Sequence, residues 1–176
     1  MPQSVPIDPD KWLAHARELI EQLGAGRPKT TLLRRAVSTA YYGLFHTLNL
    51  GVAADLLPAG TADQRHEIAR TFGHQEIKQC CAWIAGRQTT PSQPVVLLVK
   101  QLKNSPLVAV SDAFCDLQEA RHQADYDHRA AMSKPTVVAL VDDAERAARD
   151  FGAVAAPDRQ AFAAMVAIRA RLTQKR

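Results

Sequence analysis

Apolar residues recur every three to four positions along most of the chain, the spacing of an amphipathic helix. No stretch alternates apolar and polar residues as a half-buried strand would. The pattern predicts six main helices, over about residues 9–23, 30–49, 61–84, 106–126, 134–151 and 157–172. Residues 95–102 are apolar throughout much of their length and predict either a short helix or an irregular apolar cover.

Polar caps and helix breakers mark the ends of these segments. Asp8 precedes Pro9, and Ser133 lies two residues before Pro135, so each pair predicts a helix start. The glycines and proline of residues 24–28 end the first helix, and we expect a loop over residues 51–60.

Short connections between amphipathic helices predict an all-α protein built as an antiparallel up-and-down bundle. We expect the bundle to span residues 8–156, and a basic C-terminal helix over residues 157–176 to pack on it or on a partner. The expected core includes Trp12, Leu19, Val37, Leu44, Phe72, Phe114, Leu117, Leu140 and Phe151.

Composition narrows the class of protein. The 176 residues are 47% hydrophobic and 23% charged, which fits one domain with a real core. The net charge of +4 mildly favours binding to polyanions. The longest apolar run, residues 95–99, is too short to span a bilayer, and residues 1–6 do not begin a signal peptide. We therefore expect a cytoplasmic protein with no membrane partner.

The cysteines predict neither a disulfide framework nor a metal site. There are three, an odd number, and two of them are adjacent. A zinc site formed by His66, His74 and Cys80 would match no common ligand spacing, so we expect no metal and no cofactor.

Arg121 interrupts an apolar stripe. Helical steps of three and four give Leu107, Val110, Phe114, Leu117, Arg121, Ala124 and His128. A shielded guanidinium needs an anionic partner or an anionic ligand. Asp125, one turn further on, is a partner that would make Arg121 structural. His128 on the same face favours a second interpretation, in which Arg121 stabilises a phosphorane and His128 moves protons.

A second stripe runs beside the core face of the predicted helix over residues 30–49, and consists of Arg35, Thr39, Tyr42, His46 and Asn49. Solvated faces are usually built from long flexible side chains, whereas tyrosine, histidine and asparagine bind and orient other groups. Plain exposure and a binding face both remain open for this stripe.

Two segments together resemble the HEPN family. They are Tyr41-Tyr42-Gly43-Leu44-Phe45-His46, which follows Arg35, and Arg121-His122-Gln123-Ala124-Asp125-Tyr126-Asp127. The second is similar to the R-x-x-A-D-Y-D signature of a small bacterial HEPN branch. The resemblance covers about residues 10–151.

The resemblance implies a helical bundle that often dimerises. Many HEPN proteins are RNA endonucleases with an R-x(4–6)-H motif, which Arg121 and His128 match at its longest spacing. Asp125 and Tyr126 match the ADYD signature. Other members pair with minimal nucleotidyltransferases in toxin–antitoxin systems.

The leading hypothesis is a toxin-like, metal-independent endoribonuclease that acts as a homodimer with a composite site of Arg121 and His128. Asp125, Tyr126, Arg35, Tyr42 and His46 would support the site or bind RNA. The alternative is a non-catalytic HEPN module that binds a nucleotide or a nucleotidyltransferase antitoxin partner. Its binding face would then be Arg35, Tyr42 and His46. A purely structural helical protein is a third option.

Overall fold

The computed structural model describes residues 7–22, 30–89, 93–127 and 129–174. These residues form eight helices and no strand: α1 (Pro9–Glu21), α2 (Thr30–Leu56), α3 (Ala62–Arg70), α4 (His74–Ile84), α5 (Gln93–Leu102), α6 (Leu107–Tyr126), α7 (Lys134–Ala153) and α8 (Ala156–Gln174).

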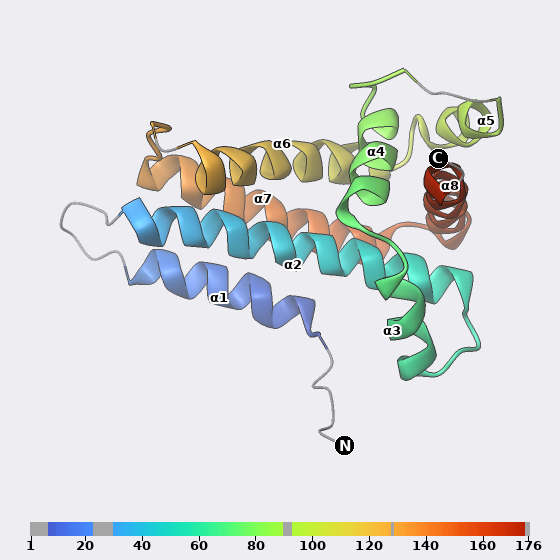
Figure 1. Cartoon of the computed structure of the whole chain (residues 1–176), viewed down its shortest axis with the longest axis horizontal. Helices are drawn as coiled ribbons and strands as arrows, with labels where there is room; N and C mark the ends of the chain where they lie inside the picture. The colour runs from blue at the N-terminus through green and yellow to red at the C-terminus, as the bar shows by residue number, and fades with distance from the viewer. Residues whose placement is uncertain (1–6, 23–29, 90–92, 128, 175–176) are drawn as a thin grey trace.

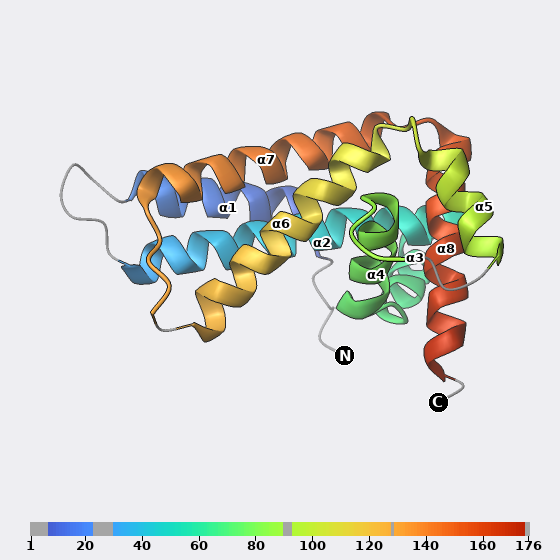
Figure 2. The same ribbon diagram turned by 90° about the horizontal axis from the view of Figure 1, so that it is seen from above.

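Four long helices, α1, α2, α6 and α7, lie alongside one another and alternate in direction in chain order (Figure 1). Helix α2 is central, since it packs against α1, α6, α7 and α8. The prediction of an all-α antiparallel bundle is confirmed. Seen from above, α6 crosses α2 obliquely, so the two helices diverge toward one end (Figure 2).

The remaining helices gather at one end of the bundle (Figures 1 and 2). The connection from α2 to α6 contains α3, α4 and α5, and α8 runs across this end against α2, α4 and α5. Among the described residues, no helix is both long and apolar enough to cross a membrane.

Helix α2 continues to Leu56, so the expected end at Asn49 and loop from residue 51 were wrong. Gly51 lies inside α2, and the ring of Phe151 on α7 fills the space that a side chain at residue 51 would occupy. A Cβ at Gly51 would collide with Phe151 Cε1. Here the glycine permits a close approach between helices rather than ending one.

The expected helix over residues 61–84 is two helices. Thr61 begins α3 with a capping box to Gln64, and Gly73 precedes α4. At the break between them, Asn49 Nδ2 donates to the carbonyls of Ala69 and Phe72 at 3.0 and 3.4 Å. This buried amide satisfies backbone groups that a continuous helix would have paired internally.

The predicted caps are confirmed, since the side chain of Asp8 accepts from the Asp10 amide and that of Ser133 from the Thr136 amide. Most of the expected core is also confirmed, because Leu19, Val37, Leu44, Phe72, Phe114, Leu117 and Phe151 are buried. Leu140 is only partly buried, and Trp12 is 37% exposed, so its place in the core was a wrong prediction.

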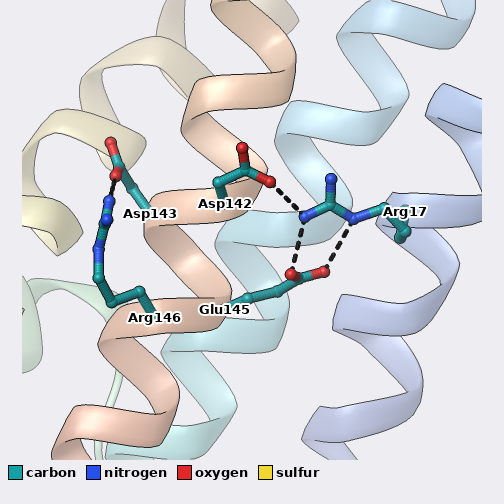
Figure 3. A network of polar contacts seen from close by, with 5 residues as sticks. All are labelled: Arg17, Asp142, Asp143, Glu145 and Arg146. Carbon is teal, nitrogen blue, oxygen red and sulfur yellow. Dashed lines mark hydrogen bonds and ion pairs between the residues drawn. The ribbon is translucent and has the colours of Figure 1, made fainter.

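An arginine ties α1 to α7 (Figure 3). Arg17 Nε donates to Glu145 Oε1 at 3.1 Å, and its Nη2 donates to Glu145 Oε2 at 2.7 Å and to Asp142 Oδ1 at 2.5 Å. The hydrogen bonds to Glu145, and then that to Asp142, raise the pKa of Arg17 above its ordinary value. Within α7, Arg146 pairs with Asp143, one turn away. Arg17 thus joins α1 to α7 through two carboxylates, and we call Arg17, Asp142 and Glu145 the Arg17 network.

Candidate functional site

Arg121 lies on α6 where it faces α2, with its side chain 22% exposed. Its Nε is 2.6 Å from Asp125 Oδ2, so the expected pairing one turn along the helix is confirmed. Its Nη2 also donates to the Tyr42 hydroxyl at 3.2 Å. The guanidinium therefore bridges α6 and α2.

Three tyrosine rings surround this guanidinium. Its central carbon lies 5.6 Å from the ring centroids of Tyr41 and Tyr42, and 5.7 Å from that of Tyr126. Burial alone lowers the pKa of Arg121, but Tyr42 and then Asp125 offset this effect, and the pKa lies above its ordinary value. Arg121 is thus a fixed cation held by aromatic faces and one carboxylate.

Asp125 has a second partner. Ser38 on α2 donates its hydroxyl to Asp125 Oδ1 at 2.5 Å. The carboxylate is therefore held from both helices, which fixes its direction relative to Arg121. Together these bonds link the first half of α2 to the end of α6.

His74 also belongs to this cluster, although no pattern in the sequence predicted a role for it beside Arg121. It is the first residue of α4, and its Nδ1 lies 2.9 Å from the Tyr41 hydroxyl. Its ring stacks on Phe45 with centroids 3.9 Å apart. Burial raises the pKa of Tyr41 far above its ordinary value, so the phenol stays protonated and donates to neutral His74.

His46 lies one turn beyond Tyr42 on α2, and the two rings stack with centroids 6.3 Å apart. Burial, and then the charge of His74, lower the pKa of His46. Burial, and then the charge of Arg121, lower the pKa of His74. Both imidazoles are therefore neutral at pH 7 and able to accept protons. We call Tyr41, Tyr42, His46, His74, Arg121 and Asp125 the Arg121 patch.

The predicted binding stripe on α2 divides into different environments. Tyr42 and His46 are half-buried members of the Arg121 patch, and Arg35 is exposed. Asn49 is buried and holds the break between α3 and α4, as described above. The stripe is therefore not a uniform solvated face.

The other predicted site residues lie at the end of α6. Tyr126 is 62% exposed, and its ring covers Arg121 on one side and approaches His122, 5.1 Å away, on the other. His128 lies outside the residues that the structure describes. Its pairing with Arg121 therefore stays a prediction.

Arg34 holds the end of α6, and sequence reasoning missed it. Its guanidinium donates to the carbonyls of Ala124 at 2.6 Å, Asp127 at 2.8 Å and Ala130 at 2.9 Å, with a longer contact to Gln123. The last carbonyls of a helix have no partner within it, so a cation at this point binds and caps them. Arg34 thereby holds the carbonyls of Asp127 and Ala130 beside the end of α6.

Two pockets flank the Arg121 patch. The first, of about 360 Å³, lies between α1 and α2, and Trp12, Arg34, Arg35, Tyr42 and Asp125 are among its lining residues. The second, of about 220 Å³, is lined by His46, His66, Arg70 and His74 together with apolar residues. Their aromatic lining residues are in contact, since Trp12 of the first pocket lies 5.8 Å from His46 of the second, and 5.6 Å from Tyr42.

No group of three or more potential metal ligands occurs in the described part of the chain. His66 and His74 line the same pocket, whereas Cys80 is buried in the core. All three cysteines are buried free thiols.

In comparisons with known proteins, no family model, curated protein or solved structure matches this chain. The resemblance to the HEPN family therefore stays a prediction from the two sequence segments.

Proposed function

We propose that the protein is a metal-independent endoribonuclease whose reactive centre is the Arg121 patch. The observation that supports this most is that one fixed cation and two imidazoles, His46 and His74, share the patch, and that both imidazoles have lowered pKa values. A cation with two histidines supplies the charge stabilisation, the base and the acid that RNA cleavage needs.

In the proposed reaction His46 takes the proton from the ribose 2′-hydroxyl, and the 2′-oxygen attacks phosphorus. Arg121 stabilises the extra negative charge of the phosphorane. His74, which is mostly neutral at pH 7, first takes a proton from water. The bond from phosphorus to the 5′-oxygen breaks, and the protonated ring gives that oxygen a proton from Nε2. The Tyr41 hydroxyl, 2.9 Å from Nδ1, turns to accept the Nδ1 proton of the cationic ring.

The test is cleavage of single-stranded RNA in the presence of EDTA. The expected products carry 2′,3′-cyclic phosphate and 5′-hydroxyl ends, and DNA survives because it lacks the nucleophile. His46→Gln and His74→Gln should each lower the rate by about 100-fold or more. His15→Gln is the matched control, since His15 lies on the exposed face of α1 beside Glu18.

His128→Ala belongs in the same experiment because the R-x(4–6)-H motif assigns the histidine role to residue 128. Loss of cleavage in this variant alone would move the site from the Arg121 patch to the motif. No cleavage of any RNA, or equal rates for wild type and both glutamine variants, would end the proposal.

We keep the homodimer as part of the proposal, with the two copies of α6 close together. The large exposed aromatic residue of α6, Tyr126, is available for such a contact. Because one chain already supplies two imidazoles, cleavage would not depend on the second copy. Light scattering that finds only monomer at tens of micromolar would remove the dimer and leave the reaction.

The second candidate is a non-catalytic HEPN module that binds a nucleotide or a nucleotidyltransferase partner. The observation that favours it is the pairing of Arg121 with Asp125, which neutralises the cation before any ligand arrives. Binding of RNA or a nucleotide without cleavage under any condition would select this function. Any toxin-like activity would then come from the nucleotidyltransferase pair and not from RNA cleavage by this chain.

A further inference from the structure

The pocket between α1 and α2 carries positive charge that nothing in the described residues neutralises. Arg35 forms no hydrogen bond or ion pair within the described residues, and Arg34 binds only neutral carbonyl groups. The one acidic lining residue, Asp125, is already paired with Arg121. Two guanidinium groups without a carboxylate partner favour an anion in this pocket.

The same pocket has an aromatic wall. Trp12 is 37% exposed, and its indole is in tilted contact with the rings of Tyr42 and His46, whose centroids lie 5.6 and 5.8 Å away. An exposed tryptophan fixed by other rings is a suitable platform for a nucleobase, since base stacking needs a rigid flat face. It also gives a reason for the exposure of an aromatic residue on α1.

The size of the pocket and its contact with the Arg121 patch indicate which class of ligand it can hold. A volume of about 360 Å³ lies at the small end of the range for ligand pockets, and is suitable for one nucleotide. Tyr42 lines this pocket and also binds the Arg121 guanidinium at 3.2 Å. A strand with one nucleotide in the pocket would therefore place a neighbouring phosphate over the Arg121 patch.

We propose that this pocket is a subsite for one nucleotide of a single-stranded RNA, with its base stacked on Trp12 and its phosphate bound by Arg35. The inference rests on the proposed function, because it names how the substrate of the Arg121 patch is held. It concerns binding, so it can be tested without cleavage.

The test uses tryptophan fluorescence and a 2′-O-methyl oligonucleotide of about six nucleotides, which cannot be cleaved because its 2′-oxygen is blocked. Trp12 is exposed and the second tryptophan, Trp83, is buried at 4% exposure, so a stacked base should quench Trp12 alone. Quenching should saturate in wild type and disappear in Trp12→Phe.

Arg35→Gln should weaken the binding by about tenfold and make it less dependent on salt. Arg149→Gln is the matched control, since Arg149 is exposed on α7 and does not line the pocket. Thermal unfolding of each variant checks that the fold is intact.

Equal affinities for Arg35→Gln and Arg149→Gln, or binding without quenching of Trp12, would overturn the subsite. Quenching of Trp12 with no cleavage of any natural RNA would leave the subsite and remove the nuclease. Cleavage of RNA without quenching by the oligonucleotide would leave the nuclease and remove the subsite.

Discussion

Arg17 and Arg121 each join two helices of the bundle, but their partners differ. Arg17 faces two carboxylates, Glu145 and Asp142, so its charge is more than neutralised. Arg121 faces one carboxylate, a phenol and three aromatic rings. Two carboxylates around Arg17 leave no positive charge to attract an anionic ligand. Arg121 has one carboxylate partner, so less negative charge opposes its own.

The neighbours of the two arginines differ in a second way. The Arg17 network consists of one guanidinium and two carboxylates, with no imidazole among them. Beside Arg121 stand His46 and His74, whose pKa values are lowered by burial. Only the Arg121 patch can therefore exchange protons with a substrate, and this difference separates a structural tie from a candidate reactive centre.

The sharpest test of this difference is to replace each arginine by lysine and to measure RNA cleavage in EDTA. Arg121→Lys should lower the rate by about 100-fold, because an ammonium cannot keep both the Tyr42 and the Asp125 contacts. Arg17→Lys should cleave at the wild-type rate. Equal losses in the two variants would mean that both arginines act through the fold.

Arg34 differs from both Arg17 and Arg121, because its hydrogen-bond partners are backbone carbonyls. Arg34→Ala should lower the free energy of unfolding by about 1–2 kcal/mol, because the carbonyls at the end of α6 lose their donor. The adjacent Arg35→Ala is the control and should change stability little, since its side chain is exposed. Urea unfolding measures both, and an equally large loss in Arg35→Ala would argue against the capping role.

The Arg17 network should contribute less to stability than Arg34. Arg17→Ala should cost about 1 kcal/mol in low salt, and the cost should shrink in 1 M NaCl because the pairs are partly exposed. The salt dependence of urea unfolding is the measurement. A loss that is unaffected by salt would show that Arg17 acts through packing of its aliphatic stem instead.

The smallest expected effect is a pH dependence of stability that comes from the Arg121 patch. The folded pKa values of His46 and His74 are lowered, so the unfolded chain binds more protons between these values and the ordinary pKa of about 6.5. The free energy of unfolding should therefore fall as the pH drops below about 6.5.

Urea unfolding between pH 5 and pH 8 is the measurement for this effect. The double variant His46→Gln/His74→Gln should flatten the profile in this range. A profile that the double variant does not alter would exclude these two imidazoles as its source.

Local features of the sequence predicted their structures well. The caps at Asp8 and Ser133 and the pairing of Arg121 with Asp125 each depend on residues within one helical turn. Such interactions form wherever the helix forms, so spacing alone is enough to predict them.

Contacts between helices distant in sequence could not be predicted in this way. His74 reaches the Arg121 patch from α4 only because of how α4 packs, and nothing in its neighbours indicates this. Arg34 and Arg35 are adjacent and chemically identical and line the same pocket, yet only Arg34 caps α6. Which of the two faces α6 is decided by the rotation of α2 in the bundle, a tertiary property.

The contact between Gly51 and Phe151 has an evolutionary consequence. Any side chain at residue 51 would collide with the ring, since its Cβ would meet Phe151 Cε1. The two positions should therefore vary together among relatives, with a larger residue at 51 accompanied by a smaller one at 151. In a double-mutant cycle, Phe151→Leu should be less damaging in a Gly51→Ala background than in wild type. Purely additive losses would show that α2 and α7 adjust independently at this crossing.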